Sequence, residues 1–293
     1  MAIDPTCAPQ CYASILAPDL AVTRDSLRQT VLDQMKLERV LKYCATQGAC
    51  GNLWVDPAHI GFLGQSLGSL IGAVTTAVSP DLQASVLNVG AGDWVRFLSD
   101  TSTPAIRCPL IDALLGAGVI AGGDAAKWNL GANPMALCLS DTWKTDPGFL
   151  QFAASARWML DPVDGANYAS MYGSDRARVF LGEVIGDEVV PNSATDEFGA
   201  LIPGVMAAPA AVSMSTMPSP TPALATAGAH WIQYASIDAS GAFPGNLYSH
   251  GSLLAPATHD MTSTALDPAG VLGTALMQTD TLTFLATNLA TPQ

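Results

Sequence analysis

The residues whose types and spacing suggest chemistry are Gly64-Gln65-Ser66-Leu67-Gly68, which follow the pattern G-x-S-x-G. The mostly apolar run 60–63 predicts a buried strand before this segment, and the apolar positions of 70–74 predict a helix after it. A serine on such a sharp strand-to-helix turn is exposed and can act as a nucleophile. Gly64 and Gly68 are expected to leave room where Cβ atoms would collide. The alternative is an ordinary turn with a capping serine.

A serine nucleophile needs a histidine to accept its proton, and the chain contains 4 histidines. Where a G-x-S-x-G turn carries the nucleophile, the order along the chain is serine, carboxylate, histidine, so His59 comes too early. His230 opens a predicted strand, where a structural role is favoured. His250 lies in a loop beyond the last predicted strand, where the base should emerge. We therefore predict His250, with His259 as the second candidate.

The third member of such a triad is a carboxylate that orients the histidine. Asp187 follows the predicted strand 178–184 in a Gly-Asp-Glu-Val-Val-Pro segment. Sites of parallel sheets lie at the carboxyl ends of their strands, so Asp187 is the predicted acid. Glu183 and Glu188 remain alternatives, and a turn-capping role is the other interpretation of Asp187.

The elements that must position these residues alternate between strands and helices, which predicts an α/β fold with a mostly parallel sheet flanked by helices. The pattern at 24–43 predicts a helix that Thr23 or Asp25 would cap. The segment 203–222, rich in proline, methionine and serine, predicts a surface loop or a helix-poor wrap. The other predicted elements are strands at 59–64, 84–89, 178–184 and 230–234, and helices at 66–78 and 271–289.

The long stretch 93–175 between two predicted strands favours a helical cap or lid over the site. We call the strand-to-helix turn at 64–68 the elbow. The predicted organisation is therefore a core part at 1–92 with the elbow, the cap at 93–175, and a second core part at 176–293 with the acid and the histidine. Four tryptophans of the cap are expected either to line an acyl pocket or to be core residues: Trp94, Trp128, Trp143 and Trp158.

Composition excludes several classes of protein. The 293 residues are 49% hydrophobic and 13% charged, which is typical of a globular chain with one sizeable core. A net charge of −13 argues against a nucleic-acid partner. The chain has no apolar run of ~18 residues, so no membrane span is predicted. The oligomeric state is left open.

The six cysteines form local pairs along the sequence, Cys7 with Cys11, Cys44 with Cys50 and Cys108 with Cys138. An even number of cysteines in such pairs favours disulfides and therefore a secreted or periplasmic protein, although the first residues lack the features of a signal peptide. The alternative is a cytosolic protein with reduced thiols. The spacing is a poor match to a structural zinc site, and no metal is predicted.

Several segments together resemble a known family: the elbow at 64–68, the segment 24–30 before it, 160–169, and 183–192 with its Gly-Asp-x-x-Val-Pro pattern. They resemble bacterial extracellular lipases of the virulence-factor type, within the α/β-hydrolase superfamily, over about residues 20–290. The resemblance implies an α/β-hydrolase-like fold and a carboxylic ester hydrolase, an esterase or lipase acting on acyl esters. It also implies that Ser66, Asp187 and His250 form the triad.

The sequence departs from that family in two places. Gln65 stands where the family more often has histidine, and a neutral amide there leaves the nucleophile intact. The chain also begins late for this superfamily, so its N-terminal strands are expected to be truncated. The Leu67 backbone N–H is predicted to stabilise the oxyanion, while a second donor is not assigned. Loss of one such donor typically costs ~10²–10³ in rate.

The expected chemistry is acyl transfer to water without a cofactor. Ser66 Oγ attacks the ester carbonyl, His250 takes its proton, and Asp187 holds the imidazole. One rival function is a polyester depolymerase or peptidase with the same triad. The other is a hydrolase-like binding domain without catalysis.

Overall fold

A computed structural model describes residues 15–16, 19–52, 54–120, 138–172, 178–210, 218–235, 247–256 and 268–290 of the chain. The described residues form a sheet in which every pair of neighbouring strands is parallel, with the order β1-β2-β3-β5-β4. The β1 and β4 strands are therefore the two outermost strands. The strands are β1 (Gly61–Gln65), β2 (Ala84–Asn88), β3 (Arg178–Val184), β4 (Ala207–Pro209) and β5 (His230–Tyr234).

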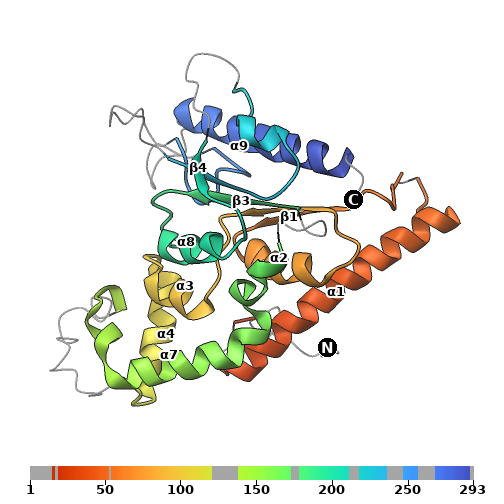
Figure 1. The fold of residues 1–293 in the computed structure, drawn as a ribbon. Helices are drawn as coiled ribbons and strands as arrows, with labels where there is room; N and C mark the ends of the chain where they lie inside the picture. The colour runs from red at the N-terminus through yellow and green to blue at the C-terminus, as the bar shows by residue number, and fades with distance from the viewer. Residues whose placement is uncertain are drawn as a thin grey trace.

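Helices cover both faces of this sheet (Figure 1). Helix α9 (Pro268–Ala290) lies on one face, and α2 (Leu67–Val78) and α8 (Asn192–Ala200) lie on the other. Successive strand residues point to opposite faces, so Val86 belongs to the core under α9 and Leu87 to the core under α2. Every residue of β2 and all but the first residue of β3 are buried, as expected for strands of a parallel sheet that is covered on both faces. The predicted α/β class with a parallel sheet is confirmed.

The first helix is longer than its sequence pattern indicates. Helix α1 spans Leu20–Gln47, and Asp19 caps it by accepting hydrogen bonds from the Ala21 and Val22 N–H groups at 2.9 Å and 3.3 Å. The predicted caps, Thr23 and Asp25, are therefore wrong. The helix begins with the apolar residues Leu20, Ala21 and Val22, which do not distinguish a helix from irregular chain. The sequence pattern therefore did not show where the helix begins.

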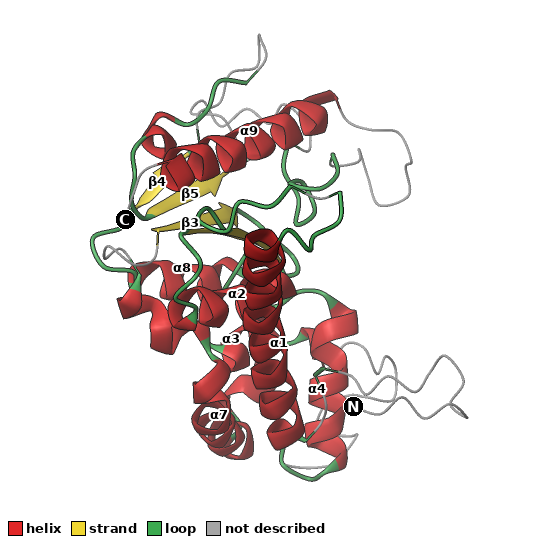
Figure 2. Ribbon diagram, turned by 90° about the vertical axis from the view of Figure 1, so that its right-hand side faces the viewer, coloured by secondary structure: helices red, strands yellow, loops and turns green. Residues whose placement is uncertain are grey.

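The elements between β2 and β3 lie beyond α2, on the side of the sheet away from α9 (Figure 1). They have an apolar cluster of their own, which includes Ile111, Trp143 and Phe149, and α7 packs against α1 (Figure 2). This part of the chain comprises α3 (Trp94–Asp100), α4 (Pro104–Gly116), η1 (Thr142–Thr145), α7 (Pro147–Leu160), η2 (Asp161–Val163) and η3 (Gly165–Met171).

The tryptophans of this region divide by environment. Trp94 and Trp143 are buried, with 3% and 0% of their surface exposed, so both are core residues and not the lining of an open acyl pocket. Trp158 on α7 is 76% exposed, because it lies on the face of the helix that no described element covers. Trp128 lies outside the described residues.

The segment predicted as a surface loop contains a strand. Residues Ala207–Pro209 form β4, which pairs with β5, and η4 (Pro222–Ala225) follows later in the chain. Three residues are too few to show a strand pattern, and a proline is tolerated there because β4 is an edge strand. The predicted loop is therefore wrong for this part of 203–222.

Two of the predicted cysteine pairs are disulfides. Cys44 is bonded to Cys50 just after α1, and Cys108 on α4 is bonded to Cys138. The pair Cys7 and Cys11 lies outside the described residues. None of the described helices is both long and apolar enough to cross a membrane.

Candidate active site

Ser66 lies at the turn between β1 and α2, in a backbone conformation that residues other than glycine rarely adopt. Its φ is 56° and its ψ is −120°, and its N–H donates to the Asn88 carbonyl at 3.0 Å. Such a conformation costs about 1–3 kcal/mol and is typical of functional sites. The Val89 and Asp93 residues, just beyond β2, also have positive φ, at 45° and 51°. Backbone strain is thus concentrated at the carboxyl ends of β1 and β2.

The two glycines of the elbow differ in what they allow. A Cβ atom at Gly64 would lie 2.5 Å from the Gly68 carbonyl oxygen, so only glycine lets the strand and helix approach this closely. A Cβ at Gly68 would meet nothing within 4 Å. The steric prediction is confirmed for Gly64 and wrong for Gly68, because the strand residue points into the helix while the helix residue points into open space.

The start of α2 presents backbone donors beside the serine. The Ser66 carbonyl accepts from the Ser69 and Leu70 N–H groups, so the helix begins directly after the elbow. The first N–H groups of a helix have no partner within it and favour negative charge. Leu67 is the first residue of α2, which is the position that the predicted oxyanion donor requires.

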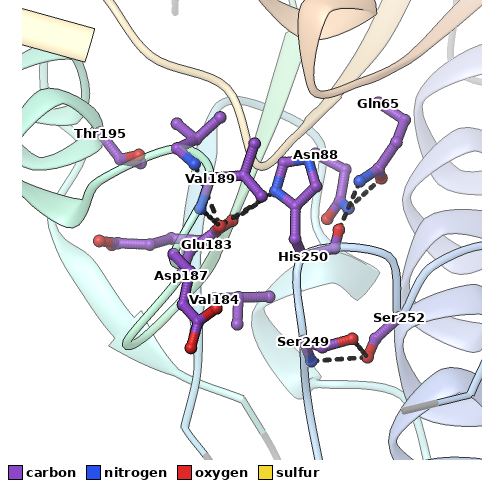
Figure 3. A network of polar contacts seen from close by, with 12 residues as sticks. Gln65, Asn88, Glu183, Val184, Asp187, Val189, Thr195, Ser249, His250 and Ser252 are labelled. Atoms are coloured by element: carbon purple, nitrogen blue, oxygen red, sulfur yellow. Dashed lines mark hydrogen bonds and ion pairs between the residues drawn. The ribbon is translucent and has the colours of Figure 1, made fainter. Parts of the chain in front are cut away.

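The structure brings the predicted acid and base together. His250 Nδ1 lies 2.8 Å from Asp187 Oδ2 and 3.0 Å from Oδ1 (Figure 3). The Asp187 carboxylate is almost completely buried, with 2% of its side chain exposed, whereas 22% of the His250 side chain is exposed. Asp187 Oδ1 also accepts from the Val189 and Val190 N–H groups at 2.8 Å and 3.1 Å, which fixes the carboxylate. Binding at Nδ1 leaves His250 Nε2 free for another partner.

The three predicted residues come from different elements at one edge of the sheet. Ser66 follows β1, Asp187 follows β3, and His250 lies in the chain after β5. Because these strands are parallel, their carboxyl ends meet at the same edge, where sites of such sheets form. Within the described chain, no hydrogen bond joins the Ser66 hydroxyl to the His250 ring. In free enzymes this contact is often long and shortens when substrate binds.

A contact that the sequence pattern did not reveal joins the elbow to the histidine loop. The Gln65 side-chain amide donates to the His250 carbonyl oxygen at 2.6 Å, and the Asn88 amide donates to Gln65 Oε1 at 2.5 Å (Figure 3). In sequence, Gln65 is only a departure from a family pattern, and Asn88 is the polar end of an apolar strand. That polar strand end was the available signal, since polar groups at carboxyl ends of parallel strands often serve the site.

The alternative acids lie in other environments. Glu183 is buried in β3, where it accepts hydrogen bonds from Trp231 Nε1 at 2.8 Å, Gln233 Nε2 at 3.0 Å and Asn192 Nδ2 at 2.7 Å. Burial raises the pKa of Glu183 above its ordinary value. The Glu188 side chain is exposed. Neither carboxylate contacts His250 in the described structure, so Asp187 is the only one of the three that does.

The other histidines are also engaged elsewhere. His59 Nδ1 lies 2.7 Å from Asp56 Oδ2, and His230 Nε2 lies 2.9 Å from the Thr226 carbonyl. Both lie at the amino ends of their strands, β1 and β5, which is the opposite edge from Ser66. His259 lies outside the described residues.

The loop that carries Asp187 is fastened on two sides. Asn192 donates to the Val184 carbonyl at 2.8 Å and accepts from the Gly186 N–H at 2.7 Å, which closes the loop at its base. The Glu188 carbonyl accepts hydrogen bonds from three hydroxyl groups of the α3–α4 connection, those of Thr101, Ser102 and Thr103, at 3.0–3.1 Å. The region between β2 and β3 therefore helps to hold the acid in place.

No metal centre is formed by the part of the chain that the structure describes: it holds no group of three or more His, Cys, Asp or Glu residues placed to bind a metal ion.

A parallel sheet flanked by helices, with a strained serine elbow after one strand and an acid–histidine pair at the same edge, defines an α/β-hydrolase-like fold. A scan against protein-family models finds no match for this chain, and a search of the curated proteins finds none either.

Solved structures that resemble the chain include a peptidase, an esterase and a lactonase. An acylaminoacyl peptidase from Pyrococcus horikoshii matches with a TM-score of 0.42 and 10% identity, over 92% of this chain and 30% of the peptidase. An acetyl xylan esterase from Thermoanaerobacterium sp. gives a TM-score of 0.37, 13% identity and coverage of 91% and 58%. An enol-lactonase from Burkholderia xenovorans matches with a TM-score of 0.32 and 14% identity, over 71% of this chain and 64% of the lactonase. The chain thus spans less than two thirds of each, and all three TM-scores lie below one half.

Proposed function

We propose that this protein is a serine hydrolase of carboxylic esters, an esterase or lipase with Ser66, Asp187 and His250 as its triad. The proposal rests mainly on the 2.8 Å contact between Asp187 Oδ2 and His250 Nδ1, at the edge of the sheet that also carries the strained Ser66 elbow. A buried carboxylate that holds Nδ1 of a histidine is the arrangement that a general base requires. The elbow strain supports the same function, since strained backbone conformations cluster at active sites and a nucleophile elbow places its serine on such a turn.

In this mechanism, His250 Nε2 accepts the proton of Ser66 Oγ as the oxygen attacks the ester carbonyl. Asp187 keeps the proton of the neutral imidazole on Nδ1 and stabilises the imidazolium once it forms. The Leu67 N–H donates to the oxyanion of the tetrahedral intermediate. His250 then protonates the leaving alcohol and, in the second half of the reaction, activates water that releases the acid from Ser66. This chemistry needs no cofactor.

We also propose that the substrate is a small-molecule or lipid ester and that the protein works outside the cytoplasm. The disulfides Cys44–Cys50 and Cys108–Cys138 support export, because such bonds persist in oxidising compartments.

The test compares wild type with Ser66→Ala on p-nitrophenyl butyrate and on a long-chain p-nitrophenyl ester, with fluorophosphonate labelling of both proteins. Wild type should hydrolyse at least one ester and become labelled, and Ser66→Ala should do neither while its circular dichroism is unchanged. The ratio of the two rates separates esterase from lipase. A folded wild type that neither turns over nor is labelled would refute the proposal and favour a binding domain.

A further inference from the structure

The backbone of His250 is held at the site by a side chain from the nucleophile strand. Gln65 and His250 are 185 positions apart in the chain, and the hydrogen bond from Gln65 Nε2 to the His250 carbonyl is 2.6 Å long. Asp187 fixes only the His250 ring, through Nδ1. The position of a base depends on its backbone as well, so the Gln65 contact determines where the ring lies relative to the elbow.

A second amide determines which end of Gln65 faces the histidine. Asn88 is buried at the end of β2, with 2% of its surface exposed, and is paired with Gln65 in the register of β1 and β2. Its Nδ2 donates to Gln65 Oε1, so the Gln65 amide group must present its N–H₂ end to His250. Without this contact, the amide could turn over and place one carbonyl oxygen against another.

The same Asn88 also holds the serine. Its backbone carbonyl accepts from the Ser66 N–H at 3.0 Å and from the Ser69 hydroxyl at 2.7 Å. A continuous chain of hydrogen bonds therefore runs from the backbone of the nucleophile, through Asn88 and Gln65, to the backbone of the base. Ser66 and His250 lie on separate elements, and these hydrogen bonds connect both of them to the ends of β1 and β2.

We infer that Gln65 is a positioning residue, which sets the distance between nucleophile and base through the His250 backbone, with Asn88 orienting its amide. The inference rests on the proposed function for its catalytic consequence. A neutral amide suits this role because it can donate to a carbonyl without adding charge beside the base. Glutamate at this position would have only acceptor oxygens for that carbonyl and would place a negative charge near the imidazole.

The test uses Gln65→Met, which keeps the length of the side chain but neither donates nor accepts strongly, and Gln65→Glu. Gln83→Met is the matched control, because Gln83 Nε2 also donates to a backbone carbonyl, that of Ala58, but at the opposite edge of the sheet. With p-nitrophenyl butyrate, Gln65→Met should lower kcat by about 10- to 100-fold, as expected for a misplaced catalytic group, with little change in KM. Gln83→Met should have the kcat of wild type.

Two further readouts separate positioning from a general loss of structure. Gln65→Glu should move the acidic limb of the kcat/KM profile to higher pH, because a nearby negative charge favours the imidazolium. Hydrogen exchange followed by mass spectrometry should be faster in the 247–256 segment of Gln65→Met than of Gln83→Met, while the thermal midpoints of both stay close to wild type.

The outcomes distinguish this inference from the proposed function. An active wild type with unchanged kcat, pH profile and hydrogen exchange in the Gln65 variants would overturn the inference and leave the hydrolase proposal intact. An inactive wild type would refute the proposed function and the catalytic role of Gln65 together. If Gln65→Met does not fold, the pH profile of Gln65→Glu decides: an unshifted acidic limb at wild-type kcat would overturn the inference.

Discussion

Replacing Asp187 by asparagine tests the assignment of the acid, and the structure defines how the new side chain must lie. Asp187 Oδ1 accepts the Val189 and Val190 N–H groups at 2.8 Å and 3.1 Å, so the oxygen of an asparagine has to occupy this position. The NH₂ group then takes the place of Oδ2, 2.8 Å from His250 Nδ1. Two donors cannot share that contact, and the imidazole proton is forced from Nδ1 to Nε2.

The expected loss follows from this change of tautomer. A histidine that carries its proton on Nε2 cannot accept the proton of Ser66, so kcat should fall by about 10⁴-fold, the size measured for the same change in a serine protease triad. In free energy, this is about 5.4 kcal/mol of lost transition-state stabilisation. The thermal midpoint should change little, because asparagine has the same shape and keeps the acceptor for both backbone N–H groups.

The assay is p-nitrophenyl butyrate hydrolysis between about pH 5 and about pH 9, and thermal melting is followed by circular dichroism. Glu188→Gln is the matched control, since it removes the same charge from the adjacent, exposed side chain and should keep wild-type kcat. The reasoning is refuted if Asp187→Asn stays within tenfold of wild type, or if Glu188→Gln or Glu183→Gln loses as much activity.

Two further predictions concern the elbow and the buried carboxylate. Gly64→Ala places its Cβ 2.5 Å from the Gly68 carbonyl oxygen and should cost about 1–3 kcal/mol of stability as well as activity, whereas Gly68→Ala should melt like wild type; equal melting of the two variants would contradict this. Burial raises the pKa of Glu183 above its unfolded value, so the folded state favours the protonated carboxyl group. The stability that this group contributes is therefore present below the unfolded pKa and is lost as pH rises through the raised, folded pKa. Wild type should therefore lose stability relative to Glu183→Gln over that pH window, and a difference in thermal midpoint that is constant with pH would argue against it.

Local patterns were sufficient for the elements that make up the core. The strands at 178–184 and 230–234 were predicted with the bounds that the structure has, because both are rich in the β-branched and aromatic residues that favour strands. The elbow could be recognised for the same reason, since G-x-S-x-G between a strand and a helix is a property of adjacent residues. The first turn of α1 and the short edge strand β4 were missed because neither shows a pattern of sufficient length.

The relation between distant residues was decided by the tertiary structure. Chain order allowed Glu183, Asp187 or Glu188 as the acid, and only the packing of β3 against β5 turns Glu183 toward Trp231 and leaves Asp187 to face His250. The polar end of β2 at Asn88 was the one hint of polar contacts at this place, but the sequence could not show that Gln65 meets His250, because that contact depends on a loop after β5 reaching the end of β1.

The sequence by itself therefore determined the class of fold and the position of the serine elbow, which follow from hydrophobic periodicity and a local motif. It also gave the order of the candidate triad, which follows from the chain order that accompanies a G-x-S-x-G turn. The tertiary structure alone decided which carboxylate faces the histidine, which amide holds it, and that Trp94 and Trp143 belong to the core. The physical reason is that hydrogen bonds and burial depend on distances across the sheet, and these are set by the strand order β1-β2-β3-β5-β4 and not by spacing along the chain.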